Sequence, residues 1–104
     1  MSEFNNVTVT REANVYFDGN VTSRAVTFAD GTVKTLGIMM PGGYTFGTVK
    51  AEIMEILAGV LRYRLAGTKE WTVVKGGESF NVPSESSFDL EVTELADYCC
   101  SYID

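Results

Sequence analysis

Turn signals recur along this chain at short and regular intervals, and this spacing strongly limits the folds that the chain can adopt. The signals lie mostly about ten residues apart, a spacing typical of a β-sandwich or a small β-barrel. They are Asp18-Gly19-Asn20, Asp30-Gly31, Pro41-Gly42-Gly43, Ala58-Gly59, Ala66-Gly67 and Gly76-Gly77. We therefore expect an all-β domain of short strands joined by turns.

The runs between these turns are rich in Val, Thr, Tyr and Phe, which favour strands. The predicted strands are 21–28, 33–40, 44–49, 71–74, 79–82, 88–92 and 98–102. The first two are separated by Ala-Asp-Gly-Thr at 29–32, which predicts a hairpin in which Gly31 supplies a positive φ.

The segment 51–65 is compatible with two secondary structures. Four of its apolar residues recur at the spacing of one helix face, which by periodicity alone favours an amphipathic helix. These residues are Met54, Leu57, Leu61 and Leu65. Gly59 weakens that interpretation, because glycine costs a helix about 1 kcal/mol relative to alanine. The alternative is a pair of strands that turns at Ala58-Gly59.

Length and charge exclude several classes of protein. A chain of 104 residues predicts a single domain. The net charge of −6, with eight scattered Lys and Arg residues, disfavours binding to nucleic acid. We expect no membrane association, because no apolar run approaches the length of a membrane span. We expect a cytoplasmic protein, because the start of the chain lacks the pattern of a secretory signal. The adjacent Cys99 and Cys100 support the same location, because they are unsuited to form a disulfide with each other.

Two motifs identify a more specific fold. Residues 52–59 read E-I-M-E-I-L-A-G and residues 77–83 read G-E-S-F-N-V-P, and their spacings, E-x6-G and G-x5-P, resemble the two signature motifs of cupins. This resemblance implies a single-domain cupin, an RmlC-like jelly-roll β-barrel, over residues 14–104, with residues 1–13 as an extension or first strand. It also favours strands over a helix for 51–65.

The metal site of typical cupins is missing from the sequence. Cupins combine a glutamate with three histidines, whereas this chain contains no histidine. Counting from the motifs, the histidine positions fall on Thr45 and Gly47, or on Phe46 and Thr48, and on Phe88. At most one ligand of four would be left, too few for zinc or iron. We therefore expect no metal and no other cofactor.

Further stretches resemble one small family of cupins, the pyrimidine/purine nucleoside phosphorylases. They are N-V-Y-F-D-G at 14–19, F-A-D-G-T-V-K-T-L-G at 28–37, P-G-G-Y-T-F-G-T at 41–48, G-G-E-S-F-N-V-P at 76–83 and Y-C-C-S-Y at 98–102. The resemblance implies an enzyme that cleaves purine and pyrimidine nucleosides with inorganic phosphate as co-substrate. The products would be the free base and α-D-ribose 1-phosphate.

Glu52 is the candidate catalytic residue, because a carboxylate stabilises the cation-like sugar of such a transition state. In cupins this position points into the barrel. Alternation along a strand would then turn Met54 and Ile56 inward and Glu55 outward. The alternative is a surface glutamate at a strand edge.

The candidate substrate-binding residues offer hydroxyl groups for the ribose or aromatic faces for the base. They are Thr45, Phe46, Thr48, Phe88 and Tyr16. The alternative for these positions, and for Phe88 above all, is ordinary core packing. For phosphate the sequence favours Arg24 and Arg62 over the other cations, although both could pair with surface acids.

Two further expectations concern assembly and a rival function. A small open barrel exposes an edge strand, which a second copy can cover, so a homodimer is expected. The main alternative to an enzyme is a non-enzymatic cupin that binds or senses a small molecule.

Overall fold

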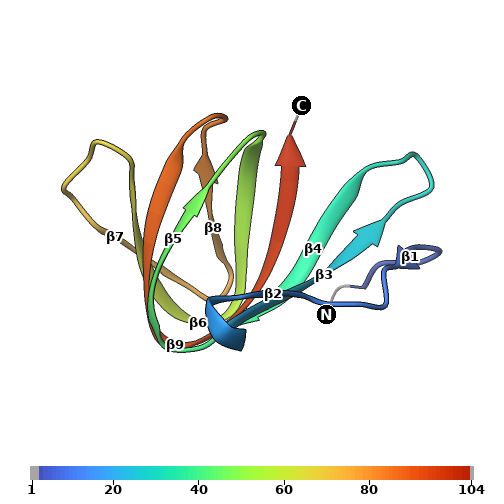
Figure 1. The fold of residues 1–104 in the computed structure, drawn as a ribbon, viewed down its shortest axis with the longest axis horizontal. Coiled ribbons are helices and arrows are strands. Elements are labelled where there is room, and N and C mark those ends of the chain that lie inside the picture. Colours follow the sequence, from blue (N-terminus) through green and yellow to red (C-terminus); the bar gives the residue numbers. More distant parts are fainter. Residues whose placement is uncertain (1–2, 104) are drawn as a thin grey trace.

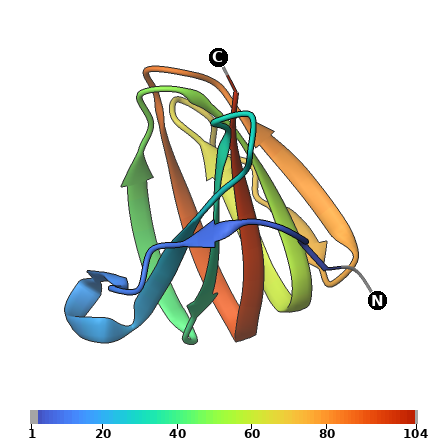
Figure 2. The same ribbon diagram turned by 90° about the vertical axis from the view of Figure 1, so that its right-hand side faces the viewer.

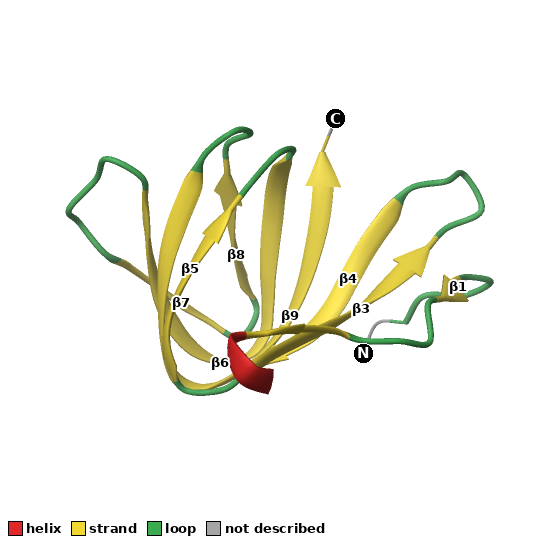
Figure 3. Ribbon diagram, viewed as in Figure 1, coloured by secondary structure: helices red, strands yellow, loops and turns green. Residues whose placement is uncertain are grey.

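The computed structural model describes residues 3–103, which form mainly β-strands with one short 3₁₀ turn (Figure 3). The strands are β1 (Thr8–Val9), β2 (Asn14–Tyr16), β3 (Val21–Thr27), β4 (Val33–Met39), β5 (Gly42–Gly47), β6 (Ala51–Leu65), β7 (Thr72–Lys75), β8 (Glu78–Val82) and β9 (Ser87–Ile103), and the turn is η1 (Phe17–Gly19). The all-β expectation is confirmed. No helix within the described residues is long and apolar enough to cross a membrane.

Two long strands, β6 and β9, contribute to both layers of the fold (Figure 1). The first half of β6 and the second half of β9 lie between β8 and β4, and β4 continues to β3. The other halves of β6 and β9 lie between β7 and β5. All these pairings are antiparallel. We call the layer with β3, β4 and β8 the first sheet and the layer with β5 and β7 the second sheet.

The bend between the two sheets is built around Gly59. The register of β6 against β9 shifts three times between Ile56 and Leu61, so the strand bulges at this point without ending. Gly59 has a φ of +99°, and a Cβ atom there would lie 2.2 Å from the carbonyl oxygen of Leu95. Only glycine fits such a close approach of two backbones.

The bend corrects one part of the sequence interpretation. Strand was the right assignment for 51–65, but the predicted turn at Ala58-Gly59 is wrong, because β9 continues alongside β6 and β6 does not reverse. For the same reason the predicted strands 88–92 and 98–102 are two halves of β9.

The hairpin predicted at 29–32 is confirmed. Gly31 has a φ of +89°, and its N–H donates to the carbonyl oxygen of Phe28 at 2.9 Å. This loop connects β3 to β4 at the upper right of Figure 1.

The core lies between the two sheets, and its most deeply buried large side chains are Met39, Ile56, Leu61, Leu90, Val21 and Val82. The strand order β1-β3-β4-β9-β6-β7 begins and ends with unpaired edges within the described residues, so the predicted barrel is an open, two-layered sheet. In Figure 2 the N-terminal segment, in blue, passes in front of the long strands, and its β1 and β2 pair with β3.

Candidate active site

A cavity of about 740 Å³ lies between the two sheets. That volume is within the range of pockets that hold small organic ligands. Its walls come from β2, β3, β4, β5, β6 and β9, together with the β3–β4 and β5–β6 loops. The two strands that cross between the sheets therefore position side chains in one shared space.

Strand register places the lining residues at different depths. The two loops form the mouth, where Asp30, Val49 and Lys50 are exposed to solvent. Next comes the level of Glu52, which pairs with Tyr102 across β6 and β9. The next level inward contains Met54, Cys100 and Thr35, and below it lie Tyr98 and Ser23. The cavity therefore changes from charged side chains at its mouth to buried, uncharged side chains at its base.

Glu52 lines the cavity and is partly buried. Burial raises the pKa of its carboxyl group, and the hydrogen bond from the Cys100 thiol to Oε1, at 3.5 Å, partly opposes this rise. Met54 and Ile56 also face inward, and Glu55 is absent from the cavity wall, as alternation predicts. Glu52 is therefore placed to act on a bound ligand.

Two phenols and a thiol that line the cavity stay protonated at neutral pH. Burial raises the pKa of Tyr102 to about 12 and that of Cys100 to about 12, and the charge of Glu52 adds to both shifts. Burial also raises the pKa of Tyr98. None of these groups therefore adds negative charge to the cavity, and the Tyr98 hydroxyl donates to the carbonyl oxygen of Thr22 at 3.5 Å.

Three of the predicted substrate-binding residues come together as an aromatic wall, which consists of Tyr16, Phe46 and Phe88. The ring centroids of Phe46 and Phe88 lie 5.9 Å apart in a stacked arrangement, and Tyr16 meets the Phe46 ring edge-on at 5.8 Å. Phe88 is only 2% exposed and belongs to the core as well. Phe46 and Tyr16 are more exposed and offer ring surface to a ligand.

The two predicted threonines lie outside the cavity wall. Thr45 is exposed, and its hydroxyl donates to Oδ1 of Asp89 at 2.7 Å. Thr48 is buried, where its hydroxyl donates to the carbonyl oxygen of Pro83 at 2.8 Å and accepts from the N–H of Ser86 at 3.0 Å. Thr48 thus joins the β5–β6 loop to the β8–β9 loop, a structural role.

The two arginines predicted to bind phosphate also lie outside the cavity wall. Arg24 alternates with Ser23 along β3, so Ser23 lines the cavity while the Arg24 Nε donates to the carbonyl oxygen of Arg11 at 3.2 Å. Arg62 follows the core residue Leu61, so its side chain points outward.

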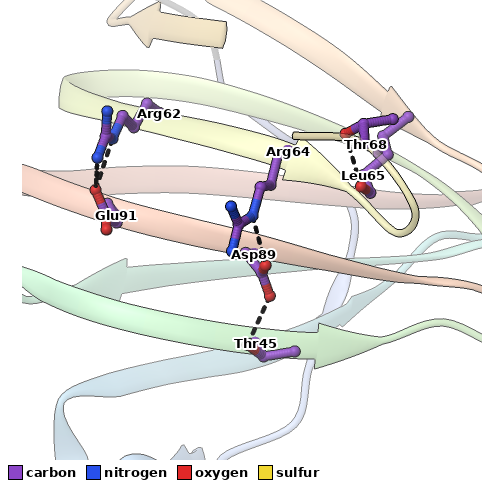
Figure 4. Close-up of polar contacts among 7 residues, drawn as sticks. All are labelled: Thr45, Arg62, Arg64, Leu65, Thr68, Asp89 and Glu91. Carbon is purple, nitrogen blue, oxygen red and sulfur yellow. Dashed lines mark hydrogen bonds and ion pairs between the residues drawn. The ribbon is translucent and has the colours of Figure 1, made fainter. Parts of the chain in front are cut away.

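Arg62 belongs to a set of charged contacts on the outer surface of the second sheet (Figure 4). Its Nε donates to Oε1 of Glu91 at 2.6 Å, and the neighbouring Arg64 pairs with Asp89 at 2.8 Å. Both guanidinium groups lie 4.5 Å from the centre of the Trp71 ring. These contacts hold both arginines outside the cavity wall.

The sequence ranked Lys50 below Arg24 and Arg62 for phosphate, yet Lys50 lines the cavity. Three further lining residues were not predicted: Tyr98, Cys100 and Tyr102. One signal for these three was available, because every second residue of β9 faces the same side as its partner on β6: Tyr102 pairs with Glu52, Cys100 with Met54 and Tyr98 with Ile56. Within residues 3–103, no group of three or more His, Cys, Asp or Glu side chains is arranged to hold a metal ion.

Comparisons with known proteins identify relatives over nearly the whole chain. A family model described as pyrimidine/purine nucleoside phosphorylase matches residues 11–102. Proteins named pyrimidine/purine nucleoside phosphorylase from Geobacter sulfurreducens and Geotalea daltonii are 63% and 59% identical over 103 residues, and each alignment covers 99% of both chains.

Solved structures support the same fold. A crystal structure of a protein of unknown function from Acinetobacter sp. ADP1 matches with a TM-score of 0.94 and 42% identity, covering 97% of this chain and 98% of that chain. An RmlC-like cupin from Shewanella frigidimarina matches with a TM-score of 0.69 at 14% identity, covering 97% of this chain and 86% of that chain. The second likeness concerns the fold alone and confirms the cupin expectation.

Proposed function

The chain belongs to the pyrimidine/purine nucleoside phosphorylase family, and we propose that it cleaves purine and pyrimidine nucleosides with inorganic phosphate. The products are the free base and α-D-ribose 1-phosphate, and the reaction proceeds without a metal or other cofactor. The observation that supports this proposal best is a cavity that combines one carboxyl group, Glu52, with an aromatic wall.

The cavity matches the parts of a nucleoside. The base stacks on the exposed ring surface of Phe46 and Tyr16, because aromatic faces attract the flat ring of any base. The ribose lies near Glu52, where the Tyr102 hydroxyl is a donor for its hydroxyl groups. A binding mode that depends on stacking accepts purines and pyrimidines alike.

Glu52 stabilises the positive charge that develops on the ribose as the glycosidic bond breaks. A carboxylate does this best in a site that is partly removed from water, where its field is weakly screened. Because burial raises the pKa of Glu52 above its ordinary value, activity is expected to decline on the acid side at a higher pH than an exposed glutamate would produce.

Assembly and location complete the proposal. The protein forms a homodimer, which is supported by the unpaired edges of the open sheet and by exposed apolar side chains such as Leu36, Leu57 and Leu95. It acts in the cytoplasm, which is supported by the free thiols of Cys99 and Cys100.

The test is to incubate the purified protein with inosine or uridine, with and without phosphate and in the presence of a chelator, and to measure the released base. Release that requires phosphate and persists with chelator supports the proposal. Release without phosphate would indicate a hydrolase. Binding of nucleoside without any release would instead favour the small-molecule sensor.

A matched pair of variants tests the carboxylate. Glu52→Gln is expected to lower kcat by about 100-fold or more, the scale of a lost electrostatic group in a transition state. Glu55→Gln is the control, because Glu55 lies three residues further along β6 and outside the cavity wall. Equal activity in the two variants would remove Glu52 from the mechanism.

A further inference from the structure

The proposed reaction needs a cation that the predicted residues do not supply. A phosphate dianion must approach the ribose beside Glu52, and the chain carries a net charge of −6 that repels it. A local positive group within the cavity is the simplest way to overcome this repulsion. A phosphate site in this cavity rests on the proposed function, phosphorolysis.

Most described cations are turned away from the cavity. Arg24, Arg62 and Arg64 make the outer contacts described above. The Lys34 ammonium lies over the rings of Phe4 and Phe28, at 5.6 and 5.9 Å from their centres. Among the described residues that line the cavity, Lys50 alone is a lysine or an arginine.

Lys50 is close to the group that would act on the ribose. It precedes Glu52 by two residues, so their Cα atoms lie at most about 7 Å apart. Both line the same cavity, with Lys50 at the mouth and Glu52 one level deeper. A phosphate held by Lys50 would therefore lie between solvent and the ribose, on the side from which it must enter.

The backbone that carries Lys50 is anchored. The N–H of Thr48 donates to the carbonyl oxygen of Ser86 at 2.8 Å, and the carbonyl oxygen of Val49 accepts from the N–H of Glu85 at 3.1 Å. These bonds, with those of the Thr48 hydroxyl, attach the loop to the β8–β9 loop. The lysine thus extends from a fixed point and only its side chain has to adjust to the ligand.

On the opposite rim of the mouth, the carboxylate of Asp30 already accepts hydrogen bonds from its own loop. Asp30 accepts from the N–H and the hydroxyl of Thr32, at 3.0 and 2.7 Å, and these bonds lower its pKa. Asp30 therefore stays ionised and disfavours an anion on its own side of the mouth. The charges of the cavity wall thus favour phosphate on the side of Lys50.

We propose that Lys50 binds the inorganic phosphate co-substrate at the mouth of the cavity. The test compares Lys50→Met with Lys50→Arg and with Lys34→Met, a matched control that removes a lysine outside the cavity wall. Steady-state kinetics with inosine give the KM for phosphate and for nucleoside separately, and phosphorus NMR titration measures phosphate binding without nucleoside.

Lys50→Met is expected to raise the KM for phosphate about tenfold or more, the scale of a hydrogen bond to a charged group, with little change in the KM for inosine. Lys50→Arg should restore most of this loss, and Lys34→Met should resemble the unmodified protein. Phosphate affinity that is unchanged in Lys50→Met, or reduced equally in Lys34→Met, would overturn the proposal.

The NMR titration separates this proposal from the proposed function. If phosphate binds, and binding is lost only in Lys50→Met, the site is supported even when no nucleoside is cleaved. If nucleosides are cleaved with phosphate but Lys50→Met leaves both phosphate constants unchanged, the function stands and the assignment of Lys50 is wrong.

Discussion

Replacing Gly59 with alanine tests the bend that brings the two sheets around the cavity. Two separate costs are expected. The first is backbone strain, since a φ of +99° costs a residue with a side chain about 1–2 kcal/mol. The second is a collision, because the new Cβ would lie 2.2 Å from the Leu95 carbonyl oxygen and 2.9 Å from the Ala96 Cα.

The collision cannot be relieved by rotating a side chain, because both neighbouring atoms are backbone. Contacts of a real Cβ essentially never fall under 3.0 Å, so the two strands must separate at the bend. Overpacking of this kind costs about 1–3 kcal/mol. The total for Gly59→Ala is therefore about 2–5 kcal/mol, a large share of the roughly 5–15 kcal/mol that stabilises a typical domain.

Gly77→Ala is the matched control for the second cost. Gly77 has a φ of +94°, but a Cβ added there meets no atom within 4 Å. Gly77→Ala should therefore lose only the folding stability that corresponds to the backbone strain. Thermal unfolding followed by circular dichroism should then show Gly59→Ala melting at least about 4 °C below Gly77→Ala, from the size dependence of the melting temperature. Melting temperatures within about 2 °C of each other would refute the collision argument.

Two further predictions concern the cavity. Because burial raises the folded-state pKa of Glu52 above 4.5, the folded protein favours its neutral form, and the associated stability is lost as pH rises through the folded pKa. In urea titrations, the free energy of unfolding of Glu52→Gln should therefore rise relative to that of the unmodified protein as pH increases above 4.5. A difference in unfolding free energy that stays constant up to neutral pH would contradict this. Phe46→Ala removes a ring of the aromatic wall and should raise the KM for nucleosides about 5- to 150-fold while leaving that for phosphate unchanged, so an equal rise in both constants would place the base elsewhere.

Local features of the chain were predictable. The hairpin at 29–32 follows from Asp-Gly, whose backbone preferences act over four residues. The inward positions of Met54 and Ile56 follow from the two-residue period of a strand, once Glu52 faces inward. The same period, applied to β9, would have identified Tyr98, Cys100 and Tyr102 as a second wall.

For other side chains, the face of the strand that they occupy depends on the register between strands, which no local pattern determines. The histidine positions of cupins fell on either Thr45 and Gly47 or Phe46 and Thr48, and a slip of one residue exchanges the two faces of a strand. In the structure Phe46 faces the cavity and Thr45 faces Asp89. Arg62 looked available for phosphate because its partner Glu91 lies 29 residues away in the sequence.

The sequence by itself determined an all-β chain, the place of its turns and the absence of histidine ligands, because these follow from residue types and from preferences that act over a few residues. Only the tertiary structure decided that Gly59 bends a strand where a turn was predicted, that the sheet stays open, and that Lys50 shares a cavity with Glu52. The physical reason is that each of these depends on contact with a distant segment. Gly59 adopts its conformation against Leu95 of β9, and the cavity exists only where β4, β6 and β9 lie side by side.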